Sequence, residues 1–150
     1  MTHSYKMHFF HLIWSTKERR PLISPDIQHR LYSYMGAIIQ KHSGRLLEIG
    51  GMPDHVHLLM ELSNLDKFTD LVRDTKAASS LWIHKTFPEA YAFNWQEGFG
   101  SFSVSYSSIE RARTYIQNQE KHHQKISFEE EYIKLLKRHG IKYDERFLFG

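Results

Sequence analysis

The stretch Pro53-Asp54-His55-Val56-His57-Leu58-Leu59-Met60 places two histidines inside a short apolar run. A run of this length and composition predicts a buried strand, which we expect over residues 55–62. Side chains alternate between the two faces of a strand, so His55 and His57 point to the same side of the sheet. The opposite side carries apolar residues that belong in a core, namely Val56, Leu58, Met60 and Leu62. One face of this strand is therefore suited to packing, and the other carries two imidazoles that are placed to hold a metal ion.

Three further strands are expected around this one. Residues 6–14 are apolar on both faces, which is typical of a central strand of a sheet. A short strand over 45–49 is followed by a turn at 50–53, and a fourth strand is expected within 99–105. The histidine strand is thus the third of four.

Helical periodicity separates these strands. Ser24 is the expected N-cap and Pro25 the first residue of a helix that stops at Gly44, and a second helix is expected over 66–86. The order β-α-β-β-α-β, followed by helices, predicts an α+β protein with the ferredoxin-like, split βαβ antiparallel sheet. Strands one and three lie in the middle of such a sheet, and helices one and two cover one face. The two histidines then face the other side, which only the extra C-terminal helices remain to cover.

Two capping boxes mark the starts of those extra helices. They are Ser107-x-x-Glu110 and Ser127-x-x-Glu130, and the second helix ends at Gly140. The first of these helices has a thin apolar stripe of Ile109, Ala112 and Ile116, which predicts shallow packing. The apolar tail at 147–149 is expected to dock on the body of the protein or on a second subunit.

The composition is that of an ordinary soluble globular protein. With 150 residues, 41% hydrophobic and 25% charged, the chain is most simply one domain over residues 1–150. It contains no cysteine, which excludes thiol catalysis and a cysteine-ligated zinc site. The apolar runs are too short for a membrane span and no secretory signal is evident, so we expect a cytoplasmic protein that does not bind membranes.

The net charge of +3 does not by itself indicate a nucleic-acid partner, but the basic residues are clustered. Phosphate backbones require such clusters, and solvent-facing helices also carry them, so both interpretations stay open for each cluster. The candidate DNA-binding residues are Lys17, Arg19, Arg20, Arg73, Lys76 and Arg111.

A second motif, Tyr115-Ile116-Gln117-Asn118-Gln119, lies in the first of the two C-terminal helices. Its i, i+4 spacing puts Tyr115 and Gln119 on one helical face, and the topology turns that helix toward the histidines. Two imidazole nitrogens and one amide oxygen form an incomplete ligand shell, and a catalytic metal needs open positions for a phosphate oxygen. Such a shell suits Mg²⁺ or Mn²⁺ with bound waters, although a histidine pair also suits Zn²⁺ or Ni²⁺.

Tyr115 is the candidate nucleophile. Its attack on phosphorus would form a phosphotyrosine bond, which conserves the phosphodiester energy so that the strand can be rejoined without ATP. A free tyrosine has a pKa of about 10, so a metal, a base or a cation such as Arg111 must assist. An isolated H-x-H or a lone tyrosine is more often structural, whereas the combination indicates metal-assisted phosphoryl transfer on DNA.

These motifs resemble those of the single-tyrosine transposases of the His-hydrophobic-His superfamily, the TnpA type of small insertion sequences. The matching segments span nearly the full chain and are residues 14–17, 51–59, the helix with Lys76, 99–105 and 115–119. The resemblance implies a homodimer that binds hairpins at the element's ends in single-stranded DNA. It also implies that His55, His57 and Gln119 hold a divalent metal, and that Tyr115 cuts the strand to leave a 5′-phosphotyrosine and a free 3′-hydroxyl.

Other functions remain open on the sequence alone. A non-enzymatic single-stranded nucleic-acid-binding protein would use the aromatic residues of the sheet to stack bases. A domesticated relative would act on repetitive palindromes, a replication initiator would use the same phosphotyrosine chemistry, and a metal-dependent hydrolase would leave Tyr115 incidental.

Overall fold

The strands of the chain form one antiparallel sheet in a computed structural model that describes residues 3–150. They are β1 (His8–Ser15), β2 (Gly44–Met52), β3 (His55–Leu62) and β4 (Gly100–Val104), in the spatial order β2-β3-β1-β4. The two most apolar strands, β1 and β3, are therefore central, as predicted. The α+β ferredoxin-like arrangement is confirmed.

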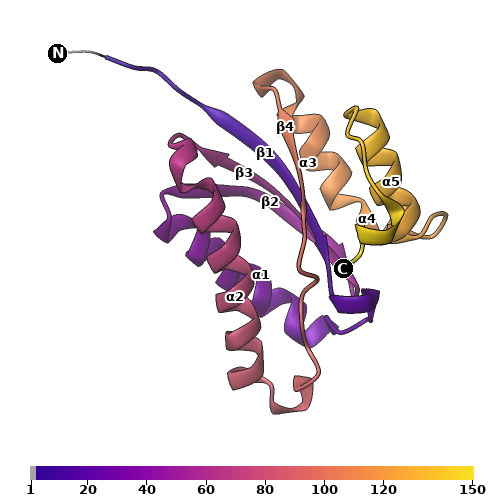
Figure 1. The fold of residues 1–150 in the computed structure, drawn as a ribbon. Helices are drawn as coiled ribbons and strands as arrows, with labels where there is room; N and C mark the ends of the chain where they lie inside the picture. Colours follow the sequence, from indigo (N-terminus) through magenta and orange to yellow (C-terminus); the bar gives the residue numbers. More distant parts are fainter. Residues whose placement is uncertain (1–2) are drawn as a thin grey trace.

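Helices cover both faces of this sheet (Figure 1). On one face lie α1 (Pro25–Lys41) and α2 (Phe68–Thr86), and on the other lie α3 (Ile109–Gln117), α4 (Gln119–His122) and α5 (Phe128–Arg138). Short 3-10 turns connect these elements at Lys17–Arg19, Leu65–Lys67, Pro88–Ala90, Tyr106–Ser108 and Glu145–Phe147. Within residues 3–150, none of the helices is both long enough and apolar enough to cross a membrane.

The larger hydrophobic core lies between the sheet and α1 and α2. Leu12 and Trp14 of β1 pair with Leu58 and Val56 of β3, and all four side chains are fully buried. Directly opposed residues of antiparallel strands lie on the same face, so these pairs form one apolar layer. The residues between them, including both histidines of β3, face α3 to α5 instead.

The start of α1 agrees with the sequence prediction, whereas its end differs. The Ser24 side chain accepts a hydrogen bond from the backbone N–H three residues later, and Pro25 occupies the first turn. The left-handed residue after the helix is Ser43, with φ 64°, and not Gly44, which begins β2. A Cβ at Gly44 would lie 2.9 Å from Cγ2 of Ile39, so the glycine permits close packing and does not terminate the helix.

β2 continues through the segment that was predicted to be a turn. Gly50 and Gly51 pair with β3 and belong to the sheet. A Cβ at Gly50 would collide with the carbonyl oxygen of Ile116 in α3. The glycine therefore lets α3 approach the sheet closely, and Ile116 is only 1% exposed. The prediction of shallow packing for this helix was wrong because it considered the helix without the strand beneath it.

The two predicted capping boxes have different outcomes. The Ser127 hydroxyl accepts a hydrogen bond of 3.2 Å from the backbone N–H of Glu130, which caps α5 as predicted. Ser107 lies inside the 3-10 turn that precedes α3, so it does not cap that helix. α3 consequently begins at Ile109 with Ser108 as its N-cap, one residue later than the sequence suggested.

The C-terminal tail docks on the body of its own chain, which is one of the two predicted alternatives. The Phe149 ring packs edge-on against Phe128 and Tyr132 of α5. The Gly150 carbonyl oxygen accepts a hydrogen bond of 2.9 Å from the backbone N–H of Glu97. The tail thereby holds α5 beside the segment that leads into β4.

Candidate active site

β3 delivers His55 and His57 to the face beneath α3 to α5, where both side chains are fully buried. Their Nδ1 atoms have fixed partners: His55 Nδ1 is 2.7 Å from Oδ1 of Asp54, and His57 Nδ1 is 2.7 Å from Nε2 of His11. A histidine that binds a metal through one ring nitrogen commonly has the other held by such a partner. Both Nε2 atoms are left to face the same space under the helices.

Tyr115 and Gln119 reach the histidines, but they do not share one continuous helix. Asn118 separates the end of α3 from the start of α4. Gln119 is 2% exposed, and its Oε1 lies 3.0 Å from Nε2 of His55. The Tyr115 ring lies edge-on to the His57 ring, with 5.7 Å between their centres. The predicted ligands and the predicted nucleophile therefore lie together within a single chain.

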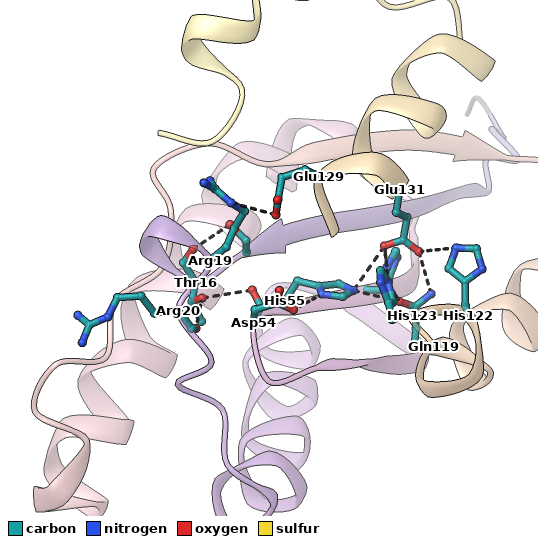
Figure 2. Close-up of polar contacts among 12 residues, drawn as sticks. Thr16, Arg19, Arg20, Asp54, His55, Gln119, His122, His123, Glu129 and Glu131 are labelled. Carbon is teal, nitrogen blue, oxygen red and sulfur yellow. Dashed lines mark hydrogen bonds and ion pairs between the residues drawn. The ribbon is translucent and has the colours of Figure 1, made fainter. Parts of the chain in front are cut away.

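Two residues outside the predicted ligand set, His123 and Glu131, complete this cluster (Figure 2). Glu131 of α5 is 1% exposed, and its Oε1 lies 2.9 Å from Nε2 of His57 and 3.0 Å from Nε2 of His123. Its Oε2 accepts a hydrogen bond from the Tyr115 hydroxyl and one of 3.1 Å from Nε2 of Gln119. Figure 2 shows these side chains converging from β3, from α5 and from the connection before α5.

The set of donors fits a divalent metal ion. One ligand atom from each of His55, His57, His123 and Glu131 lies within 4.8 Å of all the others. Imidazole nitrogens and carboxylate oxygens are common ligands of divalent metals. Because His55 Nδ1 faces a carboxylate, it carries the ring hydrogen, so the lone pair of the neutral ring points from Nε2 toward the Gln119 oxygen. Two acceptors that face one another in a buried site provide a place for a cation.

The histidines of the site differ in protonation when no metal is bound. Burial alone would lower the pKa of His55, but the carboxylates of Asp54 and Glu131 outweigh burial and raise it to about 9. Burial and the neighbouring His57 lower the pKa of His11 to about 3, so His11 is neutral. The metal-free cluster therefore holds one proton at His55 that a metal ion must displace.

Glu131 affects the pKa of Tyr115, whereas the pKa of Glu131 itself is set by the histidines. Burial and the negative charge of Glu131 raise the pKa of Tyr115 well above its usual value. Although burial opposes ionisation of Glu131, its hydrogen bonds to three imidazoles hold its pKa far below the usual range. Glu131 is therefore a permanent anion in this arrangement, and Tyr115 is a neutral hydroxyl.

Several clefts border the cluster, and two of them carry candidate DNA-binding residues. One, of about 570 Å³, is lined by Asp54, His123 and Arg19, among others. The other, of about 800 Å³, is lined by Tyr115 and by Arg111, with further basic and hydroxyl side chains from β4, α3 and α5. Cations beside a candidate nucleophile suit a phosphate backbone.

Four of the candidate DNA-binding residues lie near these clefts, either on α3 or just after the C-terminal end of β1. Lys17, Arg19 and Arg20 follow the end of β1, and Arg111 lies on α3. Arg19 pairs with Glu129 at 3.0 Å, and its guanidinium lies 4.6 Å from the centre of the Phe149 ring. Arg19 therefore also holds the tail in place.

The other two candidates, Arg73 and Lys76, lie on α2, on the opposite face of the sheet from the histidine cluster. Arg73 pairs with Asp70 at 3.0 Å and with Asp74 at 3.3 Å. Lys76 Nζ donates to the carbonyl oxygens of Glu97 and Gly98, at 2.9 and 2.8 Å. The structure thus gives both residues partners within the chain, away from Tyr115.

The sequence held a signal for Glu131 and a weaker one for His11. Glu131 falls within the buried stripe of α5, which otherwise consists of Phe128, Tyr132, Leu135 and Leu136, and an acid in such a stripe is unusual. His11 has the strand parity that places it on the same face as His57. His123 lies four residues after Gln119 and continues the helical face of Tyr115 and Gln119, but the sequence alone favoured a solvent-facing residue there, whereas the structure buries its side chain.

Comparisons with known proteins identify the family of this chain. The sequence model of the family described as "Transposase IS200 like" matches residues 4–119. The ISDra2 transposase TnpA of Deinococcus radiodurans is 25% identical over 115 residues, which cover 73% of this chain and 82% of that protein.

Two solved structures resemble the fold. A crystal structure of a candidate transposase from Deinococcus radiodurans R1 has a TM-score of 0.62 and 27% identity, over 79% of this chain and 95% of that chain. A REP-associated tyrosine transposase bound to a REP hairpin has a TM-score of 0.61 over 82% of this chain and 72% of that chain. Its identity of 15% makes that likeness one of fold alone. Because the family model covers most of the chain, including the histidine pair, Tyr115 and Gln119, this protein belongs to the IS200-like transposase family.

Proposed function

We propose that the protein is a metal-dependent single-stranded DNA transposase, which cuts and rejoins DNA at hairpin-containing element ends through a 5′-phosphotyrosine intermediate. The observation that carries this proposal is the meeting of Tyr115 with His55, His57 and Gln119 in one buried cluster. Family membership supports the activity, and the name of one structural neighbour, which is bound to a REP hairpin, supports hairpin DNA as the partner.

In this proposal, His55 Nε2, His57 Nε2 and Gln119 Oε1 hold the metal, a divalent ion such as Mg²⁺ or Mn²⁺. When bound, the ion would polarise the scissile phosphate and stabilise charge on the oxygen that leaves. Asp54 and His11 orient the two imidazoles through their Nδ1 atoms.

Tyr115 supplies the nucleophilic oxygen. The bond from that oxygen to phosphorus forms as the bond from phosphorus to the 3′ oxygen breaks, which leaves a 5′-phosphotyrosine and a 3′-hydroxyl. The hydroxyl proton of Tyr115 starts in the hydrogen bond to Glu131 Oε2, and the departing 3′ oxygen takes up a proton. Rejoining reverses this exchange with another 3′-hydroxyl, so the number of phosphodiester bonds is conserved.

Arg111 is the basic residue that this geometry favours as a phosphate contact, because it lines the cleft that contains Tyr115. Lys17, Arg19 and Arg20 border the other cleft or its approach, and we propose that they contact DNA farther from the nucleophile. Phosphate contacts position the strand without specifying its sequence.

We also propose a homodimer, which rests on the family resemblance. The apolar tail does not support it, because Phe149 packs on its own chain. Light scattering at concentrations where the protein cuts DNA should give the mass of a dimer, and a monomer there would contradict this part of the proposal.

The test is to incubate the purified protein with single-stranded hairpin DNA from the flanks of its own coding sequence and Mn²⁺, and to run a denaturing gel. A covalent protein–DNA adduct is expected, and it should be absent with a chelator or with Tyr115→Phe. Tyr106→Phe is a matched control, because Tyr106 is 83% exposed beside the start of α3 and should leave the adduct unchanged.

Other outcomes would favour other functions. Tight hairpin binding without an adduct would indicate a binding protein or a domesticated relative on repetitive palindromes. Metal-dependent turnover that survives Tyr115→Phe but is lost in His57→Ala would indicate a hydrolase in which the tyrosine is incidental.

A further inference from the structure

Glu131 and His123 lie outside the part of the chain that matches the family model, which ends at residue 119. Their side chains nevertheless lie within hydrogen-bonding distance of the atoms expected to bind the metal, on His57 and Gln119. Both side chains are almost inaccessible, at 1% and 6% exposure. A buried carboxylate and a buried imidazole are stable only if hydrogen bonds or a cation satisfy their polar atoms.

The contacts of the two ring nitrogens of His123 leave one of them without a suitable hydrogen-bond partner. Its Nδ1 lies 2.9 Å from the carbonyl oxygen of Ile126, which can only accept, so Nδ1 carries the hydrogen. The lone pair of the neutral ring then points from Nε2 toward two further acceptors, Oε1 of Gln119 and Oε1 of Glu131, each 3.0 Å away. This mismatch disappears if the ring binds a second proton or if a cation lies between these atoms.

His55 repeats the same pattern from the opposite side. Its Nδ1 hydrogen is directed at Asp54, so in the neutral ring the Nε2 lone pair faces Gln119 Oε1 at 3.0 Å and Glu131 Oε1 at 3.4 Å. Two imidazoles on different elements thus present lone pairs to the same two oxygens. Protons would have to satisfy each ring separately, whereas one cation satisfies all of these atoms together.

The separations between these atoms also agree with a shared ion. The nitrogen-to-oxygen distances range from 2.9 Å for His57 Nε2 to Glu131 Oε1 up to 3.4 Å for His55 Nε2 to Glu131 Oε1, and the ligand atoms of the three histidines and Glu131 all lie within 4.8 Å of one another. Ligands at about 2.1 Å from a metal are about 3.0 Å apart at right angles and about 3.4 Å apart at tetrahedral angles.

We propose that Glu131, through Oε1, and His123, through Nε2, are further ligands of the metal ion held by His55, His57 and Gln119. This inference rests on the proposed metal-dependent function and deepens it. Three imidazoles and a carboxylate form a donor set that selects a divalent transition metal such as Mn²⁺, Co²⁺ or Zn²⁺ over Mg²⁺. It also makes α5 part of the active site, with Glu131 linking the metal through Oε1 to the nucleophile Tyr115 through Oε2.

The first test titrates the metal-free, full-length protein with Co²⁺, Mn²⁺ and Mg²⁺ by calorimetry. Glu131→Gln should weaken Co²⁺ and Mn²⁺ binding by more than the roughly 10–100-fold typical of an outer partner of a ligand. His123→Ala should weaken it at least tenfold. Glu130→Gln is the matched control, because Glu130 is the exposed neighbour on α5 and should leave the affinity unchanged.

The second test needs no variant and therefore does not depend on the folding of Glu131→Gln. Long-range ¹H–¹⁵N spectra of the wild-type protein with Zn²⁺ report which histidine ring nitrogens bind the metal. The proposal expects three metal-bound Nε2 atoms, those of His55, His57 and His123. Two metal-bound rings, without that of His123, would overturn this inference for His123 and leave the proposed function intact. In the first test, unchanged affinity in folded Glu131→Gln would do the same for Glu131. No metal binding by the wild-type protein would contradict the metal dependence of the function itself.

Discussion

The two faces of the sheet are held together by different chemistry, although they are built from the same two central strands. Under α1 and α2, β1 and β3 bury only apolar side chains, and that packing depends little on pH or on ions. Under α3 to α5, the same strands bury the apolar Phe9, Ile13 and Leu59 and also His11, His55 and His57, beside Gln119 and Glu131. Buried polar groups are stable only when they are satisfied by hydrogen bonds or by a cation. The comparison teaches that apolar packing stabilises both faces, whereas the buried polar cluster is confined to one of them.

The largest effect should come from His57→Ala, which removes a proposed ligand from the polar face. Metal affinity and the Mn²⁺-dependent DNA adduct are expected to fall by at least about 100-fold, since a lost ligand costs more than a lost outer partner. Calorimetry and the denaturing gel measure the two quantities. An adduct that forms in this variant at wild-type yield would show that the histidine face does not carry the chemistry.

The next residue, Leu58, provides the converse test on the apolar face. Leu58→Ala removes a fully buried side chain, and we expect a loss of about 2–5 kcal/mol in the free energy of unfolding. Urea unfolding in chelator measures this loss, and calorimetry on the folded variant should give nearly the wild-type metal affinity. A loss of affinity as large as that in His57→Ala would mean that the two faces are not separable.

A smaller effect is expected from pH, and only on the polar face. In the metal-free protein the pKa of His55 is about 9, above the value of 6.5 expected for the unfolded chain. Because the folded state holds this proton more tightly, the stabilisation is complete below pH 6.5 and is lost as pH rises through about 9.

The melting temperature in chelator should therefore fall between pH 6.5 and 9. Asp54→Asn should reduce this slope, because the Asp54 carboxylate is one of the groups that raise the pKa of His55. Saturating Mn²⁺, which replaces the proton, should raise the melting temperature most at the alkaline end. A slope that is the same with and without Mn²⁺ would contradict the placement of His55 in the site.

The smallest effects concern two arginines, one on each side of the sheet. Arg111→Ala should weaken hairpin binding several-fold and reduce the salt dependence by about one phosphate contact. Arg73→Ala should change neither, because Arg73 is paired with exposed acids on α2, and such pairs contribute less than about 1 kcal/mol. Binding of a labelled hairpin at several salt concentrations measures both variants, and equal losses would place DNA on both faces.

Much of the fold could be predicted from the sequence because its signals are local. The alternation in β3 separates His55 and His57 from Leu58, and the apolar faces of β1 identify it as a central strand. The N-cap of α1 at Ser24 and that of α5 at Ser127 depend on residues only three apart. These features required no knowledge of the remainder of the chain.

The features that were missed depend on contacts between distant segments. Glu131 meets His57 across 74 residues, so no window of sequence contains both. Gly50 was assigned to a turn because the sequence does not show that the backbone of α3 lies against it. The break at Asn118 is not visible in a pattern that fits a continuous helix, yet the Tyr115–Gln119 pairing was correct in placing both residues near the histidines.

The most direct test of the central claim is to identify the residue that becomes linked to DNA. The protein is incubated with Mn²⁺ and single-stranded hairpin DNA, the DNA is digested to a short remnant, and the modified peptide is sequenced by mass spectrometry. We expect the remnant on Tyr115 through a 5′-phosphate, and its absence in His57→Ala and in chelator. A remnant on another residue, or on Tyr115 at full yield in chelator, would contradict the account.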